Sequence, residues 1–165
     1  MTGDVPTSAE WRAAMGYFPT GVTVVTSWQD GRPVGTTINA FCSVSLEPPM
    51  LLICLNHINP LREPIRDSGV FGVNILGAED GRALAKRFAD QTLKDRFEGC
   101  AYRATRDGAP QLETAPVFVD CTVEHIYDAG DHVVVVGRGI RTAHASVMPP
   151  LLYHKGKFPG FEPLG

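Results

Sequence analysis

Two segments of the sequence carry polar side chains in patterns that suit the binding of a small molecule. The first is residues 36–49, a stretch dense in Ser, Thr and Asn that ends in two prolines. On an extended strand, such a segment leaves backbone N–H and C=O groups open to a flat heteroaromatic ring with donors and acceptors on its rim. The second is Asp131 and His132, in a turn after Gly130, where the imidazole suits a base or a hydrogen-bond donor to a ligand.

Each segment also has a purely structural explanation. The hydroxyl groups of residues 36–49 also suit a solvated strand end, where they satisfy nearby backbone groups. Asp131 also suits an Asx-turn that only shapes a hairpin. From the residues alone, both explanations remain open.

The sequence lacks the signatures of several common catalytic sites. It has no Gly-x-Ser-x-Gly motif, no Gly-x-x-x-x-Gly-Lys-Ser/Thr loop and no Gly-x-Gly-x-x-Gly motif at the start of a helix. Gly137 and Gly139 lie inside an expected strand, so we predict a β-bulge or a close backbone approach there. Hydrolysis and phosphoryl transfer therefore have no recognisable machinery in this sequence.

The cysteines do not form a metal-binding pattern. Cys42, Cys54, Cys100 and Cys121 are far apart, without a Cys-x-x-Cys pair or a Cys/His cluster at zinc-finger spacing. Three of them, Cys42, Cys54 and Cys121, lie in apolar stretches, where a free Cys behaves as a small hydrophobic residue. We therefore predict reduced thiols packed in the interior and no metal.

Length and composition indicate one soluble domain over residues 1–165. Apolar residues make up 44% and charged residues 20%, as in an average globular protein, and the net charge is −3. The acidic balance disfavours nucleic acid as a partner, and no apolar run approaches the roughly 20 residues that span a bilayer. The first ten residues contain two acids and no Lys or Arg, unlike a secretory signal. We therefore expect a cytoplasmic location and no membrane partner.

Residue patterns predict two short helices and four strands in the first half of the chain. Thr7 and Glu10 have the spacing of a capping box that opens a helix reaching about Tyr17. Asp30 and Gly31 form a hairpin signal, and Pro64 is expected to interrupt or kink a helix over 60–68. The predicted strands are 21–28, 33–41, 50–55 (expected to be buried on both faces) and 70–76.

The second half predicts an exposed amphipathic helix over 78–89 and then a polar, mostly loop region over 90–111. Apolar and polar residues alternate over 117–127, which indicates a half-buried strand that returns after a turn at 128–131. A last short strand is expected at 151–154. Strands joined by tight turns are antiparallel, so the pattern predicts a mainly β barrel with peripheral helices rather than a parallel doubly wound sheet.

Five stretches resemble the flavin reductase-like family, the small reductase partners of two-component flavin monooxygenases. The resemblance extends over residues 10–158, and the run Ser43-Val44-Ser45-Leu46-Glu47-Pro48-Pro49 followed by Gly130-Asp131-His132 is specific in combination. The matching stretches are 18–26, 39–49, 71–76, 85–89 and 130–132.

The resemblance implies a split β-barrel homodimer that binds FMN or FAD. It implies an NADH:flavin oxidoreductase, with NADPH as an alternative donor, that hands free reduced flavin to a flavin-dependent monooxygenase. NADH is mildly favoured because no Arg/Lys cluster lies beside Gly130-Asp131-His132 to bind a 2′-phosphate.

The resemblance also assigns a flavin site. Residues along one strand are implied to form the wall beside the isoalloxazine ring, with Ser43 and Ser45 reaching towards the ribityl chain or the phosphate; they are Asn39, Ala40, Phe41, Cys42, Ser43, Val44 and Ser45. Thr20 and Thr37 are implied to flank this site. Lys86, Arg87 and Phe88 are implied to contact the phosphate end, where cations suit an anion; a solvated helix charge is the alternative for Arg87.

On the same basis, His132 faces the nicotinamide and orients its carboxamide, with Asp131 beside it and Tyr153 and His154 approaching from the last strand. No protein nucleophile is needed, because the cofactors carry the chemistry. The chain departs from the family after the strand that ends at Asn56, where relatives offer Ser or Thr to the phosphate. Residues 56–61 contain no hydroxyl, so Asn56 and Asn59 are the expected substitute donors.

Two other functions remain open at this level. The same barrel suits a flavoprotein that holds FMN tightly as an electron carrier, without flavin turnover. It also suits an interaction domain with an empty pocket.

Overall fold

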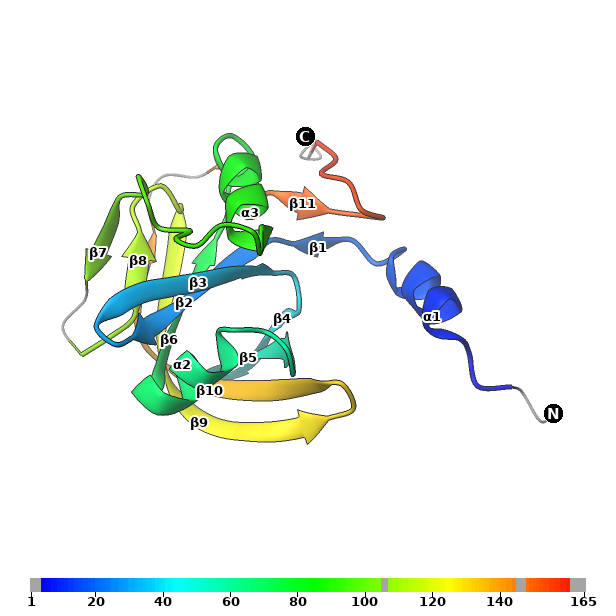
Figure 1. Cartoon of the computed structure of the whole chain (residues 1–165), viewed down its shortest axis with the longest axis horizontal. Coiled ribbons are helices and arrows are strands. Elements are labelled where there is room, and N and C mark those ends of the chain that lie inside the picture. Colours follow the sequence, from blue (N-terminus) through cyan, green and yellow to red (C-terminus); the bar gives the residue numbers. More distant parts are fainter. Residues whose placement is uncertain (1–3, 105–106, 145–147, 161–165) are drawn as a thin grey trace.

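The computed structural model describes residues 4–104, 107–144 and 148–160, and its main feature is one seven-stranded antiparallel sheet (Figure 1). The strand order is β3-β2-β6-β9-β10-β5-β4. The strands of this sheet are β2 (Thr23–Gln29), β3 (Arg32–Ile38), β4 (Phe41–Leu46), β5 (Pro49–Asn56), β6 (Val70–Ile75), β9 (Val117–Ala129) and β10 (His132–His144). Two small two-stranded sheets pair β1 (Thr20–Gly21) with β11 (Leu152–Tyr153) and β7 (Tyr102–Ala104) with β8 (Pro110–Leu112).

The large sheet curls around a single core. Its apolar cluster takes side chains from all seven strands, among them Val25, Ile53, Phe71 and Val135, and from Ile65 of α2 (Arg62–Ser68). Side chains from both ends of a flat sheet do not reach one cluster, so the sheet must roll up. Its end strands, β3 and β4, have no ladder between them in the described residues, which leaves the barrel split along this line. The mainly β prediction with peripheral helices is confirmed.

A second apolar cluster lies on the outer face of β2 and β6. Phe88 of α3 (Gly81–Ala89) packs there with Val24, Leu76 and Leu151, and its ring meets Phe97 edge-on at 5.0 Å between centroids. Burial of this kind contributes roughly 1.5–3 kcal/mol per large apolar side chain. The cluster therefore holds α3 and β11 against the sheet, next to β3.

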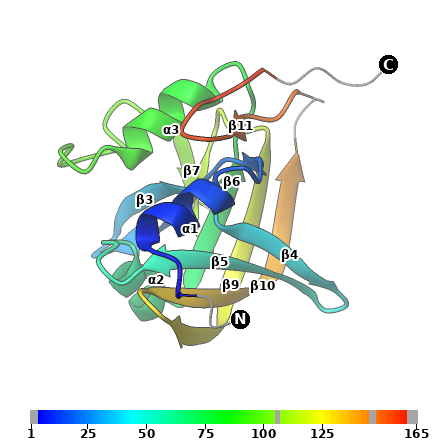
Figure 2. The same cartoon turned by 90° about the vertical axis from the view of Figure 1, so that its right-hand side faces the viewer.

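The first helix, α1 (Ser8–Met15), begins with the predicted capping box and buries none of its residues. Thr7 Oγ1 accepts from the Glu10 backbone N–H at 3.3 Å, and the Glu10 carboxylate accepts from the Thr7 N–H at 2.8 Å. Figures 1 and 2 show α1 on the outside of the sheet. Trp11 and Phe18 are 58% and 74% exposed, so this arm presents apolar surface to its surroundings.

Two local predictions are wrong. Strand β5 is not buried on both faces: Leu51, Ile53 and Leu55 are buried, but Leu52 and Cys54 between them are partly exposed, because only one face of β5 meets the core. Pro64 does not interrupt α2, because the helix begins at Arg62 and a first-turn residue has no intrahelical partner for its N–H.

The Gly137-Arg138-Gly139 prediction is confirmed on both counts. The β9–β10 register shifts between Val136 and Gly137 and again between Gly139 and Arg141. A Cβ atom on Gly137 would lie 2.4 Å from Cζ of Phe71, so this position requires a glycine for close packing. The bulges increase the local twist of the long hairpin.

All four cysteines are free, as predicted, but they are not all interior. Cys121 is buried, and burial with the nearby Asp120 charge raises the pKa of its thiol to about 12. Cys42 is exposed, which contradicts the predicted packing, because nothing in the described chain covers its face of the edge strand β4. No helix among the described residues has the length and apolar character needed to span a membrane.

Replacing Gly137 with Ala should lower the free energy of unfolding by about 1–3 kcal/mol, because the new methyl group overlaps the Phe71 ring. Chemical denaturation measures the effect. Gly139→Ala is the matched control, since its Cβ atom would make only ordinary contacts, the nearest at 3.7 Å from the Pro49 carbonyl oxygen. Equal stability of the two variants would contradict the packing described for Gly137.

Candidate functional site

Several predicted site residues surround one cavity beside the split. This cavity, here called the split cavity, has a volume of about 260 Å³ and is lined by Thr37 and Asn39 at the end of β3, Lys86 of α3 and Tyr153 of β11. Its remaining lining is Val22, Ile38, Ala85, Ala89 and Phe158. Three elements that are distant in sequence therefore bring predicted contacts into one place.

Side-chain hydrogen bonds fix the walls of the split cavity. Thr37 Oγ1 donates to the Ala85 carbonyl at 2.8 Å and so ties β3 to α3. Asn39 Nδ2 donates to Thr20 Oγ1 at 3.2 Å, and Thr20 is paired with Tyr153 in the β1–β11 ladder. The structure thus joins Thr20 to this group; its place beside a flavin stays a prediction.

A larger cavity of about 620 Å³ adjoins the split cavity and shares Asn39 and Tyr153 with it. Its other wall comes from the end of α1 and the residues that follow it, including Tyr17, over whose ring the Lys155 ammonium lies at 3.1 Å from the centroid. The α1 arm therefore borders the site.

The β4 side chains predicted to lie beside the isoalloxazine ring point to two sides of the strand. Phe41, Ser43 and Ser45 line a cavity of about 520 Å³ that also touches Arg141. Cys42 and Val44 lie between them in sequence and are exposed. Strand β4 pairs only with β5, so its other backbone edge is unpaired by any strand in the described chain, as the sequence predicted for this segment.

Phe88 and Arg87, at the end of α3, both make contacts that stabilise the fold. Phe88 is fully buried, so its side chain supports the helix and does not reach the cavity surface. Arg87 Nε donates to the Arg96 carbonyl at 2.7 Å and its Nη2 donates to the Glu98 carbonyl. Arg87 is therefore more than a solvated helix charge, because it fastens the segment 90–98 to α3; its contact with a phosphate stays a prediction.

The tip of the β9–β10 hairpin holds Asp131 and His132 in contact. His132 Nδ1 lies 2.7 Å from Asp131 Oδ1. Because a carboxylate only accepts, Nδ1 carries the proton, and Nε2 is the nitrogen left for a ligand. The hydrogen bond from His132, with the charge of the imidazole, holds the pKa of Asp131 below its ordinary value, so the pair persists until the pH falls through that lowered value.

His57 is a site residue that the sequence did not reveal. Its backbone N–H donates to the Asp131 carbonyl at 3.0 Å, and its Nε2 lies 3.1 Å from the Gly130 carbonyl oxygen. His132 is paired with Asn56 across β10 and β5, so the hairpin tip and the loop after β5 lie side by side. The only signal in the sequence was a histidine in the loop that lacks the family's hydroxyl groups. The carbonyl group that His57 contacts belongs to Gly130, 73 residues further along the chain.

Asn56 and Asn59 shape that loop. The Oδ1 atom of Asn56 accepts from the Ile58 N–H and that of Asn59 accepts from the Leu61 N–H, both at 3.0 Å. Their Nδ2 groups make no hydrogen bond within the part of the chain that the structure describes. The amide donors predicted for a phosphate are thus present, and the turn holds them in place.

Comparison with known proteins identifies the family. A protein-family sequence model, described as the flavin reductase like domain, matches residues 15–162. The chain belongs to the flavin reductase-like family. Its expected fold and site residues can therefore be compared with named relatives.

Three relatives show how close this match is. The reductase subunit HsaB of a flavin-dependent monooxygenase from Rhodococcus jostii is 36% identical, over 99% of this chain and 86% of that protein. A flavin reductase (NADH) from Kitasatospora aureofaciens is 36% identical, over 87% of this chain and 76% of that protein. The NADH:FAD oxidoreductase SgcE6 from Streptomyces globisporus, in complex with NAD and FAD fragments, superposes with a TM-score of 0.86 at 33% identity, covering 94% of this chain and 93% of that one.

The residues beside the split fit a flavin. The split cavity combines an apolar floor, including Val22 and Ile38, with a hydroxyl, an amide and the Lys86 ammonium, which suits a flat ring with a polar rim and an anionic tail. Among the described residues, no group of three or more His, Cys, Asp or Glu side chains could hold a metal ion.

Proposed function

We propose that this flavin reductase transfers a hydride from NADH to a diffusible flavin and supplies the reduced flavin to a partner monooxygenase. The observation that carries the proposal is the grouping of Thr37, Asn39, Lys86 and Tyr153 around one cavity at the end of β3, a strand that pairs only with β2 in the described part of the chain. The four free cysteines fit a reducing compartment, so the proposal places the reaction in the cytoplasm.

The named relatives support the choice of reactants and partner. The Kitasatospora protein is named for NADH, the Streptomyces structure holds fragments of NAD and FAD, and HsaB is a reductase subunit of a flavin-dependent monooxygenase. In the present chain, no Arg/Lys cluster lies beside His132 to favour a 2′-phosphate, which supports NADH over NADPH.

In this proposal, one group of residues binds the flavin and another orients the nicotinamide. The flavin, when bound, supplies the electron-accepting ring. We assign the backbone of residues 39–45 to its polar rim, and Lys86 with the amides of Asn56 and Asn59 to its phosphate end. We assign His132 to the nicotinamide carboxamide, with Asp131 fixing the imidazole tautomer. The protein thus acts by positioning two reactants.

A homodimer is part of this proposal. Exposed apolar side chains gather on α1 and on β4, where Val44 is 52% and Leu46 is 91% exposed. Large exposed apolar surfaces on a soluble protein favour association. A second copy of the chain is the partner that the family resemblance implies.

The test of the function is NADH oxidation by the purified protein with no flavin, with FMN and with FAD. We expect little oxidation without flavin and a rate that saturates as one flavin is added. Protein that purifies yellow and whose NADH oxidation ignores added flavin would instead be an electron carrier. Colourless protein without activity would contradict both functions.

Replacing His132 with Ala should raise KM for NADH roughly tenfold, as expected for one lost hydrogen bond to a ligand. The Kd for flavin, measured by quenching of flavin fluorescence, should stay within about twofold because His132 is assigned to the other reactant. His125→Ala is the matched control, an exposed histidine on the same hairpin outside the turn. Equal loss of flavin and NADH binding would show that His132 shapes the pocket instead.

A further inference from the structure

His57 contacts the tip of the β9–β10 hairpin twice, once through its backbone and once through its side chain. The backbone N–H donates to the Asp131 carbonyl at 3.0 Å, and Nε2 lies 3.1 Å from the Gly130 carbonyl oxygen. Because a carbonyl oxygen only accepts, Nε2 carries a proton and donates it. One residue of the loop after β5 therefore holds two consecutive carbonyl groups of the turn that precedes His132.

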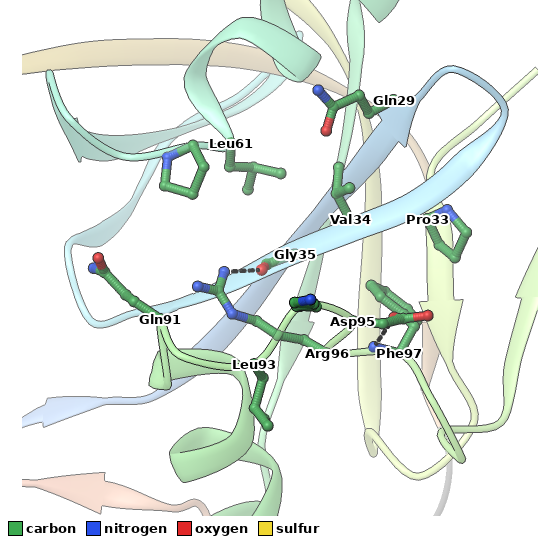
Figure 3. Close-up of a pocket in the computed structure, with 12 residues that line it drawn as sticks. Gln29, Pro33, Val34, Gly35, Leu61, Gln91, Leu93, Asp95, Arg96 and Phe97 are labelled. Carbon is green, nitrogen blue, oxygen red and sulfur yellow. Dashed lines mark hydrogen bonds between the residues drawn. The ribbon is translucent and has the colours of Figure 1, made fainter.

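The loop that carries His57, residues 56–61, is itself held in place by other contacts. Its two asparagine side chains accept from backbone N–H groups of the same loop, as described above. At its end, Leu61 is buried in the core, and Figure 3 shows its side chain pointing toward Val34 of β3. None of these contacts uses the His57 side chain, so removing that side chain should leave the loop in place.

The turn that receives these hydrogen bonds buries little surface of its own. Gly130 and Asp131 are both exposed and lie beyond the last pair of the β9–β10 ladder, Ala129 with His132. Exposed segments with few buried contacts open at a low cost in free energy. The two hydrogen bonds from His57 therefore fix the Asp131 carboxylate, which in turn holds the imidazole of His132 at 2.7 Å.

An ion pair with Asp128 is the alternative role for the His57 side chain. His57 Nε2 lies 4.0 Å from Asp128 Oδ1, and the Asp128 side chain is exposed, so such a pair contributes little. The contact with the Gly130 carbonyl is closer, at 3.1 Å. It is also compatible with a neutral or a charged imidazole, because Nε2 can carry a proton in both.

We infer that His57 is a positioning residue for hydride transfer, which holds the turn that presents His132 to the nicotinamide. The inference rests on the proposed flavin reductase function, in which His132 meets NADH while Asn56 and Asn59 meet the flavin phosphate. The His57 side chain thus joins the loop assigned to one reactant to the turn assigned to the other. A shift of this turn misplaces the nicotinamide relative to the flavin ring, and hydride transfer depends on that placement.

The experiment compares three variants at this position by steady-state kinetics with NADH and by quenching of flavin fluorescence. His57→Ala should raise KM for NADH about fivefold, as expected for one lost hydrogen bond. The Kd for flavin should stay within about twofold, because the loop keeps its own hydrogen bonds. His57→Gln should restore KM to within about twofold, because its amide N–H reaches the place of Nε2. His57→Asn, with an amide one carbon closer to the backbone, should behave like His57→Ala.

A double variant tests whether His57 acts through His132. When His132→Ala is already present, adding His57→Ala should change KM for NADH by less than about twofold, because the group that His57 positions is gone. Two losses that multiply would overturn the inference, as would equal weakening of flavin and NADH binding by His57→Ala. The matched control is Asp128→Asn, which should leave KM unchanged; a loss as large as that of His57→Ala would assign the effect to the ion pair and overturn the inference.

Amide hydrogen exchange separates this inference from the function on which it rests. The backbone N–H of residue 57, which donates to the Asp131 carbonyl, should lose protection in His57→Ala and His57→Asn and keep it in His57→Gln. If the unmodified protein does not oxidise NADH with either flavin, the proposed function fails, and this exchange still decides whether the side chain holds the turn. If NADH oxidation is normal and His57→Ala leaves KM unchanged, the inference alone fails.

Discussion

The unpaired edges of β3 and β4 are the constraint around which this molecule is organised. The sheet rolls up far enough to enclose one core, but its end strands do not form a ladder with each other in the described residues. Open edges carry backbone donors and acceptors that favour pairing with another molecule. Here Arg96 covers the Gly35 carbonyl and α3 is tied to Thr37, so parts of the β3 edge are already occupied by the chain itself. The remaining edge, with the cavities beside it, is the natural place for a flat polar ring.

Two elements decide what approaches the split. Helix α3 is fixed by Phe88 in the outer cluster, and its last turn carries Lys86 to the split cavity and Arg87 to the segment 90–98. On the other side, His57 fastens the β9–β10 tip to the loop after β5, which places His132 beside Asn56. Because the reactants of such an enzyme carry the chemistry themselves, this fixed placement is the protein's main contribution.

Local patterns predicted much of the fold, and long-range contacts account for what they missed. The capping box at Thr7 and the Gly137 bulge depend on neighbours in sequence, and both are present. The strand predicted at 117–127 is also present as β9, but its burial does not alternate as predicted, because Asp120 is buried and Tyr127 is 54% exposed. The exposure of Cys42 depends on β4 being an edge strand, which no window around it reveals.

The candidate site also combines residues that the sequence predicted with residues whose roles depend on long-range contacts. The family motifs assigned Thr37, Asn39 and Lys86 to one site, and these three residues line one cavity. Neither the role of His57 nor that of Arg96 was visible, because each depends on carbonyl groups far along the chain: Gly130 for one and Gly35 for the other. Strand register and loop closure set these contacts, and neither leaves a periodic signal in the sequence.

Hydrogen–deuterium exchange with and without saturating FMN would test most directly that the open edges hold the flavin. The amides of residues 36–45 should exchange more slowly with FMN, at a protein concentration that keeps the oligomeric state constant. The core of β6 and β9, already paired on both sides, should not change. Unchanged exchange over residues 36–45, with protection only elsewhere, would contradict the placement of the flavin at the split.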